Sequence, residues 1–219
     1  MTLLEKIRPD IEATIERLKS KKFQPDPLAG ESLSRIVSII SSAYKRHGFI
    51  IERAILEQLK LCPDLEVWED RYFQVSPSAD HIVDSAINDP SLIQHTNIPY
   101  IAGHRTLQVD AIVYDRRTGS LSAYEIKRGS GTHDSGKRRS ILRDTLCLQI
   151  LLKSYGELKN LIPQTIQSRI IFYYGKCSIG KPYSLVKNEL DDHFNWNIAS
   201  EVEKVNEHFR EKLISLIET

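Results

Sequence analysis

The chain has few cysteines, and they lie far apart. Its 219 residues include Cys62, Cys147 and Cys177, with no CxxC pair among them. Disulfide frameworks and zinc sites need closely or regularly spaced cysteines. We therefore expect neither feature, and we expect a reducing, cytoplasmic environment.

Long apolar runs are also missing. No stretch approaches the roughly 20 apolar residues that a membrane-spanning helix needs. The first segment, MTLLEKIRPDIE, carries acids early and is unlike a secretory signal. The sequence has no GxxxxGK[ST] phosphate loop and no recognisable zinc finger or other separate DNA-reading module. We expect a soluble protein that binds no membrane and carries no ATP-driven motor.

Excess charge of one sign is absent over the whole chain. The formal net charge is +1, which gives no general attraction to nucleic acid. Residues 127–144 nevertheless concentrate six basic side chains against two acids. The basic ones are Lys127, Arg128, Lys137, Arg138, Arg139 and Arg143. Such a run is by itself more typical of a solvated loop and helix start than of a binding site.

Apolar periodicity predicts the secondary structure. Helices are expected over residues 2–22, 31–61, 79–87, 138–158 and 197–217, with a pause near Gly48. Strands are expected over 65–75, 107–114, 121–127 and 168–174. This order predicts an α/β fold in which a central mixed sheet is flanked by helices.

The turn-rich segment QPDPLAG separates residues 1–23 from the rest of the chain. The narrow apolar stripe of the first helix suits either packing on the main domain or pairing with a second subunit. Residues 30–219 are expected to form one domain.

Two of these strands form a hairpin around Gly119, which supplies the positive φ of a short loop. Centring the loop between residues 117 and 118 places Ile112 opposite Ala123 and Tyr114 opposite Leu121. In the same register, Asp110 faces Glu125. Because side chains alternate along a strand, Lys127 shares their side of the hairpin.

The opposite face of this hairpin is apolar, so both faces are expected to be covered. It is lined by Val109, Ala111, Val113 and Ile126. Two carboxylates in a covered site raise each other's pKa unless a cation compensates them. Mg²⁺ binds a few carboxylates together with waters and a phosphate, and an adjacent ammonium group can steady charge on that phosphate. The alternative is a buried ion cluster that only closes the sheet.

The sequence VD, fourteen intervening residues and then EIK resembles the PD-(D/E)XK nuclease superfamily, the restriction-endonuclease-like fold. Val109 stands where the name-giving proline would be. The resemblance covers about residues 48–174. It implies a restriction-endonuclease-like core with extra terminal helices. It also implies a catalytic set of Asp110, Glu125 and Lys127.

Members of this superfamily place a glutamate on an upstream helix, and GFIIERAILEQL is similar to that element. Glu52 and Glu57 compete for the role. Glu52 projects inside the apolar arc of the helix and Glu57 outside it, which favours Glu52 as a third metal ligand with Asp110 and Glu125. Gln149 is similar to the glutamine that often follows the lysine strand, although a structural amide is equally compatible with its surroundings.

The resemblance implies a Mg²⁺-dependent DNA endonuclease, with Mn²⁺ able to substitute, most like a type II restriction enzyme. A homodimer and a cognate methyltransferase are the expected partners besides DNA. Beside such a site, the basic side chains of Arg128, Lys137, Arg138 and Arg139 become candidates for binding phosphates. The alternatives are a repair, recombination or transposition nuclease, a catalytically silent DNA-binding protein and an RNA-cutting factor.

Overall fold

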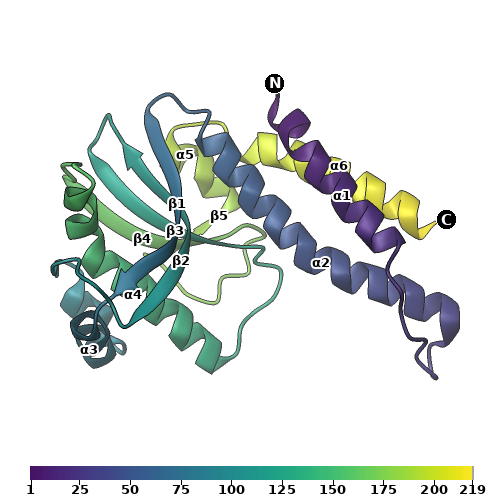
Figure 1. Cartoon of the computed structure of the whole chain (residues 1–219), viewed down its shortest axis with the longest axis horizontal. Helices are drawn as coiled ribbons and strands as arrows, with labels where there is room; N and C mark the ends of the chain where they lie inside the picture. The colour runs from purple at the N-terminus through teal and green to yellow at the C-terminus, as the bar shows by residue number, and fades with distance from the viewer. Residues whose placement is uncertain (219) are drawn as a thin grey trace.

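A five-stranded mixed sheet occupies one end of the molecule (Figure 1). The structure, a computed structural model, describes residues 1–218. The strands are β1 (Leu65–Val75), β2 (Arg105–Asp115), β3 (Ser120–Lys127), β4 (Thr165–Phe172) and β5 (Ser184–Val186), and they lie in that order across the sheet. β1, β2 and β3 are antiparallel, whereas β3, β4 and β5 are parallel. The expected α/β class with a mixed sheet flanked by helices is confirmed.

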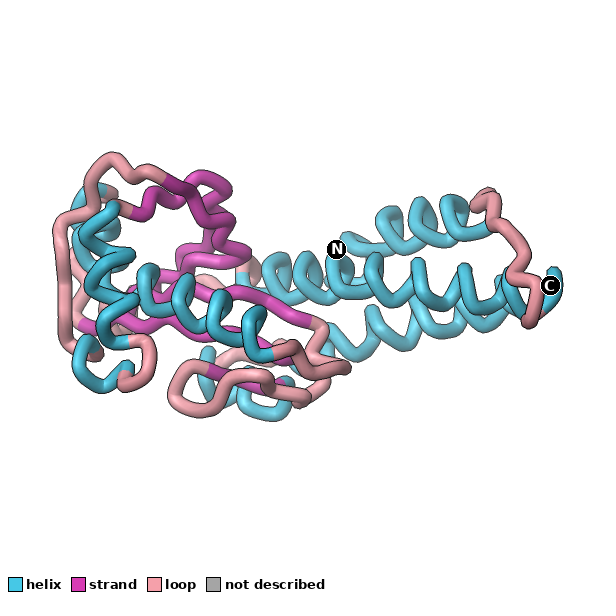
Figure 2. Tube along the Cα trace, turned by 90° about the horizontal axis from the view of Figure 1, so that it is seen from below, coloured by secondary structure: helices cyan, strands magenta, loops and turns pink. Residues whose placement is uncertain are grey.

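Long helices form the other end. The helices are α1 (Leu3–Lys19), α2 (Gly30–Leu59), α3 (Pro77–Ala86), α4 (Ser135–Leu158), α5 (Leu190–Phe194) and α6 (Ala199–Ile217), with short 3-10 turns η1 (Pro90–Ile93) and η2 (Lys187–Glu189). α1, α2 and α6 lie side by side and extend away from the sheet, whereas α3 and α4 pack beside it (Figures 1 and 2). Within residues 1–218, no helix combines the length and apolar character that crossing a membrane requires.

Each face of the sheet contributes to a separate apolar core. Ala111, Tyr124 and Ile171 pack with α1, α2 and α6. Ile112 and Ala123 pack with α3 and α4 on the opposite face. Both faces of the β2–β3 hairpin are therefore covered, as the apolar residues of its sequence indicated.

The apolar stripe of α1 is buried within the chain. Leu3, Ile7, Ile11 and Leu18 are at most 2% exposed and belong to the core shared with α2 and α6. Of the two roles expected for this helix, packing on the rest of the chain is the one observed. The stripe is thus not available as a dimer interface.

α2 does not pause at Gly48, contrary to expectation. It runs unbroken through 30 residues from Gly30 to Leu59. A glycine inside a helix costs about 1 kcal/mol relative to alanine. Burial of neighbouring residues such as Ala43, Ile50 and Ile51 outweighs that cost and keeps the helix continuous.

The predicted hairpin register is confirmed by the pairs Ile112–Ala123 and Tyr114–Leu121. Regular pairing ends at Ala111 and Tyr124, one position before the expected Asp110–Glu125 pair. The reason is a bulge in β2. Trp68 pairs with Ile112 and Asp70 with Val109, so two residues of β2, at positions 110 and 111, lie opposite one residue of β1.

The bulge also corrects the expected face of one residue. Val109 was expected on the same side as Ala111, but it packs in the α4-side core with Ile112. One extra residue in a strand shifts the alternation of side chains, because the side-chain period of a strand is two. The bulge therefore re-aims the side chains next to it, including Asp110.

Replacing a buried residue of α1 tests its packing within the chain. Ile11→Ala should lower the free energy of unfolding by about 2–5 kcal/mol, because a large side chain leaves a cavity. The exposed neighbour Glu12 provides a control, and Glu12→Ala should change the free energy of unfolding little. Thermal unfolding at several protein concentrations is the measurement. A midpoint that rises with concentration and a loss of that dependence in Ile11→Ala would place α1 in an interface between chains instead.

Candidate active site

The candidate site lies where β2 and β3 cease to pair. Asp110 is 9% exposed, and its Oδ2 accepts a hydrogen bond of 2.7 Å from the backbone N–H of Ile126. Burial raises the pKa of Asp110, and Glu125 and Glu69 add to that effect, while the Ile126 N–H and Lys127 oppose it. A carboxylate with a raised pKa is one whose negative charge is not fully compensated.

Glu125 and Lys127 form an ion pair at the end of β3. The Nζ of Lys127 lies 2.5 Å from Oε1 of Glu125, and both side chains are about one-third exposed, at 33% and 28%. Burial acts to lower the pKa of Lys127, but Glu125, Asp110 and Glu52 together hold it above its ordinary value. The ammonium group thus stays charged beside three carboxylates.

Glu52 of α2 belongs to the same electrostatic group. Burial, with a further contribution from Asp110, raises the pKa of Glu52 to about 7. Glu57, its competitor, forms ion pairs with Lys6 and Lys60 instead. The preference for Glu52 over Glu57 agrees with this geometry, because only Glu52 interacts with Asp110 and Lys127.

Three further charged residues influence the site and were not singled out from the sequence. Glu69 and Arg71 of β1 both affect the pKa of Glu52. Asp144 of α4 has a raised pKa because of its burial, and Glu125 contributes to the rise. The signal that could have revealed the first two is the run Glu-Asp-Arg inside a strand, since charged residues are uncommon in the middle of a strand.

The four candidate phosphate-binding residues differ in their surroundings. Lys137 and Arg138, in the first turn of α4, are exposed, and within residues 1–218 no ion pair holds either side chain. Arg139 is exposed and lies 3.4 Å from Oδ1 of Asn88. Arg128 is engaged within the fold: its guanidinium lies 4.4 Å from the centre of the Tyr44 ring. The exposed basic side chains among these four are therefore at the start of α4.

The carboxamide of Gln149 forms hydrogen bonds with the backbone of β4. Its Oε1 accepts from the N–H of Ser168 at 2.6 Å, and its Nε2 donates to the carbonyl of Ile166 at 3.3 Å. Both of its polar atoms are thus satisfied by β4. This arrangement favours the structural interpretation of Gln149, and no contact in the described part of the chain joins it to Asp110 or Glu125.

The donor set suits a hard cation, although it is not a complete cage. Within residues 1–218, no three carboxylate, histidine or cysteine side chains gather closely enough to hold a metal by themselves. Asp110 and Glu52 offer carboxylate oxygens with little compensation, which fits Mg²⁺ because this ion is usually held by one or two carboxylates plus waters and phosphate. The expected joint ligation by Asp110, Glu125 and Glu52 stays a prediction.

No family model, no curated protein and no solved structure matches this chain. The site must therefore be interpreted from its own residues.

The raised pKa of Glu52 predicts a pH-dependent stability. In metal-free protein the folded state resists loss of this proton, so Glu52 destabilises the fold as pH rises from 4.5 to about 7. Glu52→Gln should raise the Tm at about pH 8 and change it little at about pH 4. Thermal unfolding in chelator measures both values.

Glu57→Gln is the matched control on the same helix. Burial acts to raise the pKa of Glu57, but Lys6 and Lys60 together hold it below its ordinary value. Glu57 therefore stabilises the fold above its unfolded pKa, and this stability is lost as pH falls. Glu57→Gln should lower the Tm at about pH 8. A lower Tm for Glu52→Gln at that pH would show that Glu52 is compensated in the fold.

Proposed function

We propose that this protein is a Mg²⁺-dependent deoxyribonuclease that hydrolyses phosphodiester bonds, with the restriction-endonuclease-like core that its sequence resembles. The observation that carries the proposal is the buried Asp110 carboxylate, bonded to the Ile126 N–H, together with the Lys127–Glu125 ion pair and Glu52; burial raises the pKa of Asp110 and of Glu52. Buried groups with strongly perturbed pKa values are common at functional sites, because a purely structural role would not need the uncompensated charge.

Each residue has a distinct part in this proposal. Asp110 and Glu52 supply oxygens to the cation, which when bound lowers the pKa of water and polarises a phosphate. Lys127 stabilises the negative charge that develops on the phosphate oxygens as water attacks phosphorus. Glu125 fixes the position of Lys127 through their ion pair and offers its second oxygen to the same region. Hydrolysis then breaks one phosphorus–oxygen ester bond, and the departing sugar oxygen takes up a proton.

DNA is the proposed substrate, and the exposed Lys137 and Arg138 are the proposed phosphate contacts. Cutting both strands of a duplex needs two such sites, so we retain the homodimer as part of the proposal. Because the stripe of α1 is buried, the interface would lie elsewhere. A cognate methyltransferase would be required if the enzyme cuts its own genome's sequences.

Removing the ammonium group tests the catalytic assignment. Lys127→Ala should reduce cleavage of plasmid DNA in Mg²⁺ by at least about 100-fold, because a preorganised charge near the transition state is lost. Asp110→Asn should act likewise through weaker cation binding. The measurement is nicking and linearisation of diverse plasmid or phage DNA, with sequencing of the new ends.

Lys212→Ala is a suitable control, because Lys212 is exposed on α6, away from β3. It should cut at the wild-type rate. Wild-type protein in chelator should be inactive. Undiminished cleavage by Lys127→Ala in protein of intact fold would reject the proposed active site.

The exposed cations on α4 should contribute to DNA affinity through counterion release. Lys137→Ala and Arg138→Ala should each weaken binding and reduce the slope of log K against log salt by about 0.9 for each phosphate that is no longer neutralised. Binding is measured in chelator over a range of salt concentrations.

Arg143→Ala serves as the comparison on the same helix, because Arg143 is held in ion pairs with Asp80 and Asp84. Its salt slope should stay at the wild-type value. Equal slopes in all three variants and the wild type would mean that DNA does not lie along the start of α4.

A further inference from the structure

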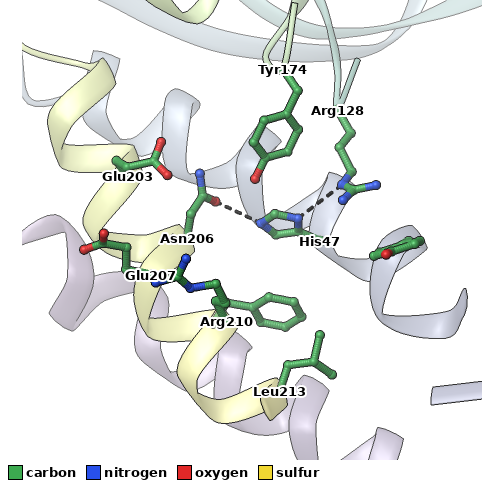
Figure 3. A pocket seen from close by; sticks show the side chains of 10 residues that line it. His47, Arg128, Tyr174, Glu203, Asn206, Glu207, Arg210 and Leu213 are labelled. Atoms are coloured by element: carbon green, nitrogen blue, oxygen red, sulfur yellow. Dashed lines mark hydrogen bonds between the residues drawn. The ribbon is translucent and has the colours of Figure 1, made fainter. Parts of the chain in front are cut away.

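A cavity of about 370 Å³ lies between α2, α6 and the segments that follow β3 and β4, and phosphodiester hydrolysis does not explain it. Figure 3 shows the side chains that line it. Its aromatic and polar lining includes Tyr44 and His47 of α2, Arg128 and Tyr174 after the ends of β3 and β4, and Asn206 and Phe209 of α6. Tyr44 and Tyr174 are 52% and 41% exposed, so their rings are accessible at the rim.

A directed chain of hydrogen bonds organises the floor of this cavity. Arg128 Nε donates to Nδ1 of the buried His47 at 3.3 Å. Because Nδ1 accepts, the ring hydrogen lies on Nε2, which donates to Oδ1 of Asn206 at 2.9 Å. Burial lowers the pKa of His47, so the ring is neutral at pH 7 and can keep this tautomer.

The chain leaves one donor without a partner. Asn206 is 5% exposed, and within residues 1–218 its Nδ2 makes no hydrogen bond of normal length, although its side chain acts on the Tyr173 hydroxyl and lowers the pKa of that group. In Figure 3 this nitrogen is turned away from His47, toward Glu203 and Tyr174. A buried amide nitrogen without a partner carries a free-energy cost, which an acceptor on a bound molecule would remove.

The charges of the lining argue against a phosphate or a metal ion as the occupant. Arg128 and Arg210 line the cavity together with Glu203 and Glu207. A phosphate would meet the two carboxylates, and a cation would meet the two guanidinium groups. A flat, neutral group that carries both donors and acceptors suits this mixed lining. A nucleobase is such a group, because aromatic rings stack on its faces and amide or carboxylate groups bond to its edge.

Arg128 links the cavity to the candidate site along the chain. Arg128 follows Lys127 directly, and neighbouring residues of an extended segment point to opposite sides. His47 precedes Glu52 by five residues of α2, a rise of about 7.5 Å along the helix. The same five residues turn the helix by about 140°, so the two side chains leave α2 on different sides.

We propose that this cavity binds an unstacked nucleobase, with the exposed rings of Tyr44 and Tyr174 as the stacking surface and the amide of Asn206 facing the base edge. The proposal deepens the proposed nuclease function and rests on its nucleic-acid substrate. It specifies DNA in which a base is free of its helix: a single strand, a frayed end or a displaced nucleotide.

Binding measured in chelator tests the pocket without cleavage. The probes are a short fluorescent single-stranded DNA and a strand of equal length in which abasic residues replace the bases. Tyr174→Leu and Tyr44→Leu should weaken binding of the base-bearing strand by about 5- to 150-fold, the range for loss of one stacked base. Both should change binding of the abasic strand by less than about twofold, because the phosphate contacts remain.

Phe49→Leu is the matched control, since Phe49 is an exposed ring on α2 that does not line this cavity. It should bind both strands as the wild type does. Equal losses on the two strands, or no loss in either tyrosine variant, would overturn the base pocket.

The two proposals fail in different ways. Wild-type protein that binds and cuts DNA, together with tyrosine variants that bind normally, would reject the pocket alone. Wild-type protein that prefers the base-bearing strand through these tyrosines but never cuts in Mg²⁺ would reject the nuclease alone. A wild-type protein that binds neither strand and leaves plasmid DNA uncut in Mg²⁺ would reject both.

Discussion

The Asp110 carboxylate stands at the end of the regular pairing between β2 and β3, where it accepts the Ile126 N–H. This hydrogen bond depends on the bulge in β2, which gives the strand one residue more than β1 at this point. At this position the Asp110 side chain, and not a regular backbone pair, joins β2 to β3. The positions of Glu125 and Lys127 relative to Asp110, and hence the whole charge group, follow from that local irregularity.

A second set of ion pairs fixes the elements around this group. Asp80 of α3 interacts with Arg105 of β2 and with Arg143 of α4, and Arg105 also binds Asp144. α4 is therefore attached to the sheet through one side of its early turns. Its exposed side carries Lys137 and Arg138, whose charges are left for solvent or a ligand. α4 thus carries Arg143, which is held in ion pairs, and also Lys137 and Arg138, which are exposed to solvent.

Much of this arrangement is predictable from local patterns. The hairpin register followed from Gly119 and strand alternation, and the choice of Glu52 followed from its place within the apolar arc of a helix. The bulge was not predictable, because it depends on the pairing of β2 with the distant β1. The two roles left open for Gln149 were not separable from the sequence for a related reason: its partners, the backbone groups of Ser168 and Ile166, come from a later strand. β5 was missed because three residues carry no usable period.

The unbroken course of α2 has a mechanical consequence. A helix of 30 residues extends about 45 Å, and its buried residues from Ile39 to Leu59 pack in the core shared with α1 and α6, before and after Glu52 in the chain. Because α2 is unbroken at Gly48, the half of the helix before this residue and the half that holds Glu52 keep their relative orientation. The packing of α1 and α6 on α2 therefore helps to set the position of the Glu52 carboxylate relative to the sheet.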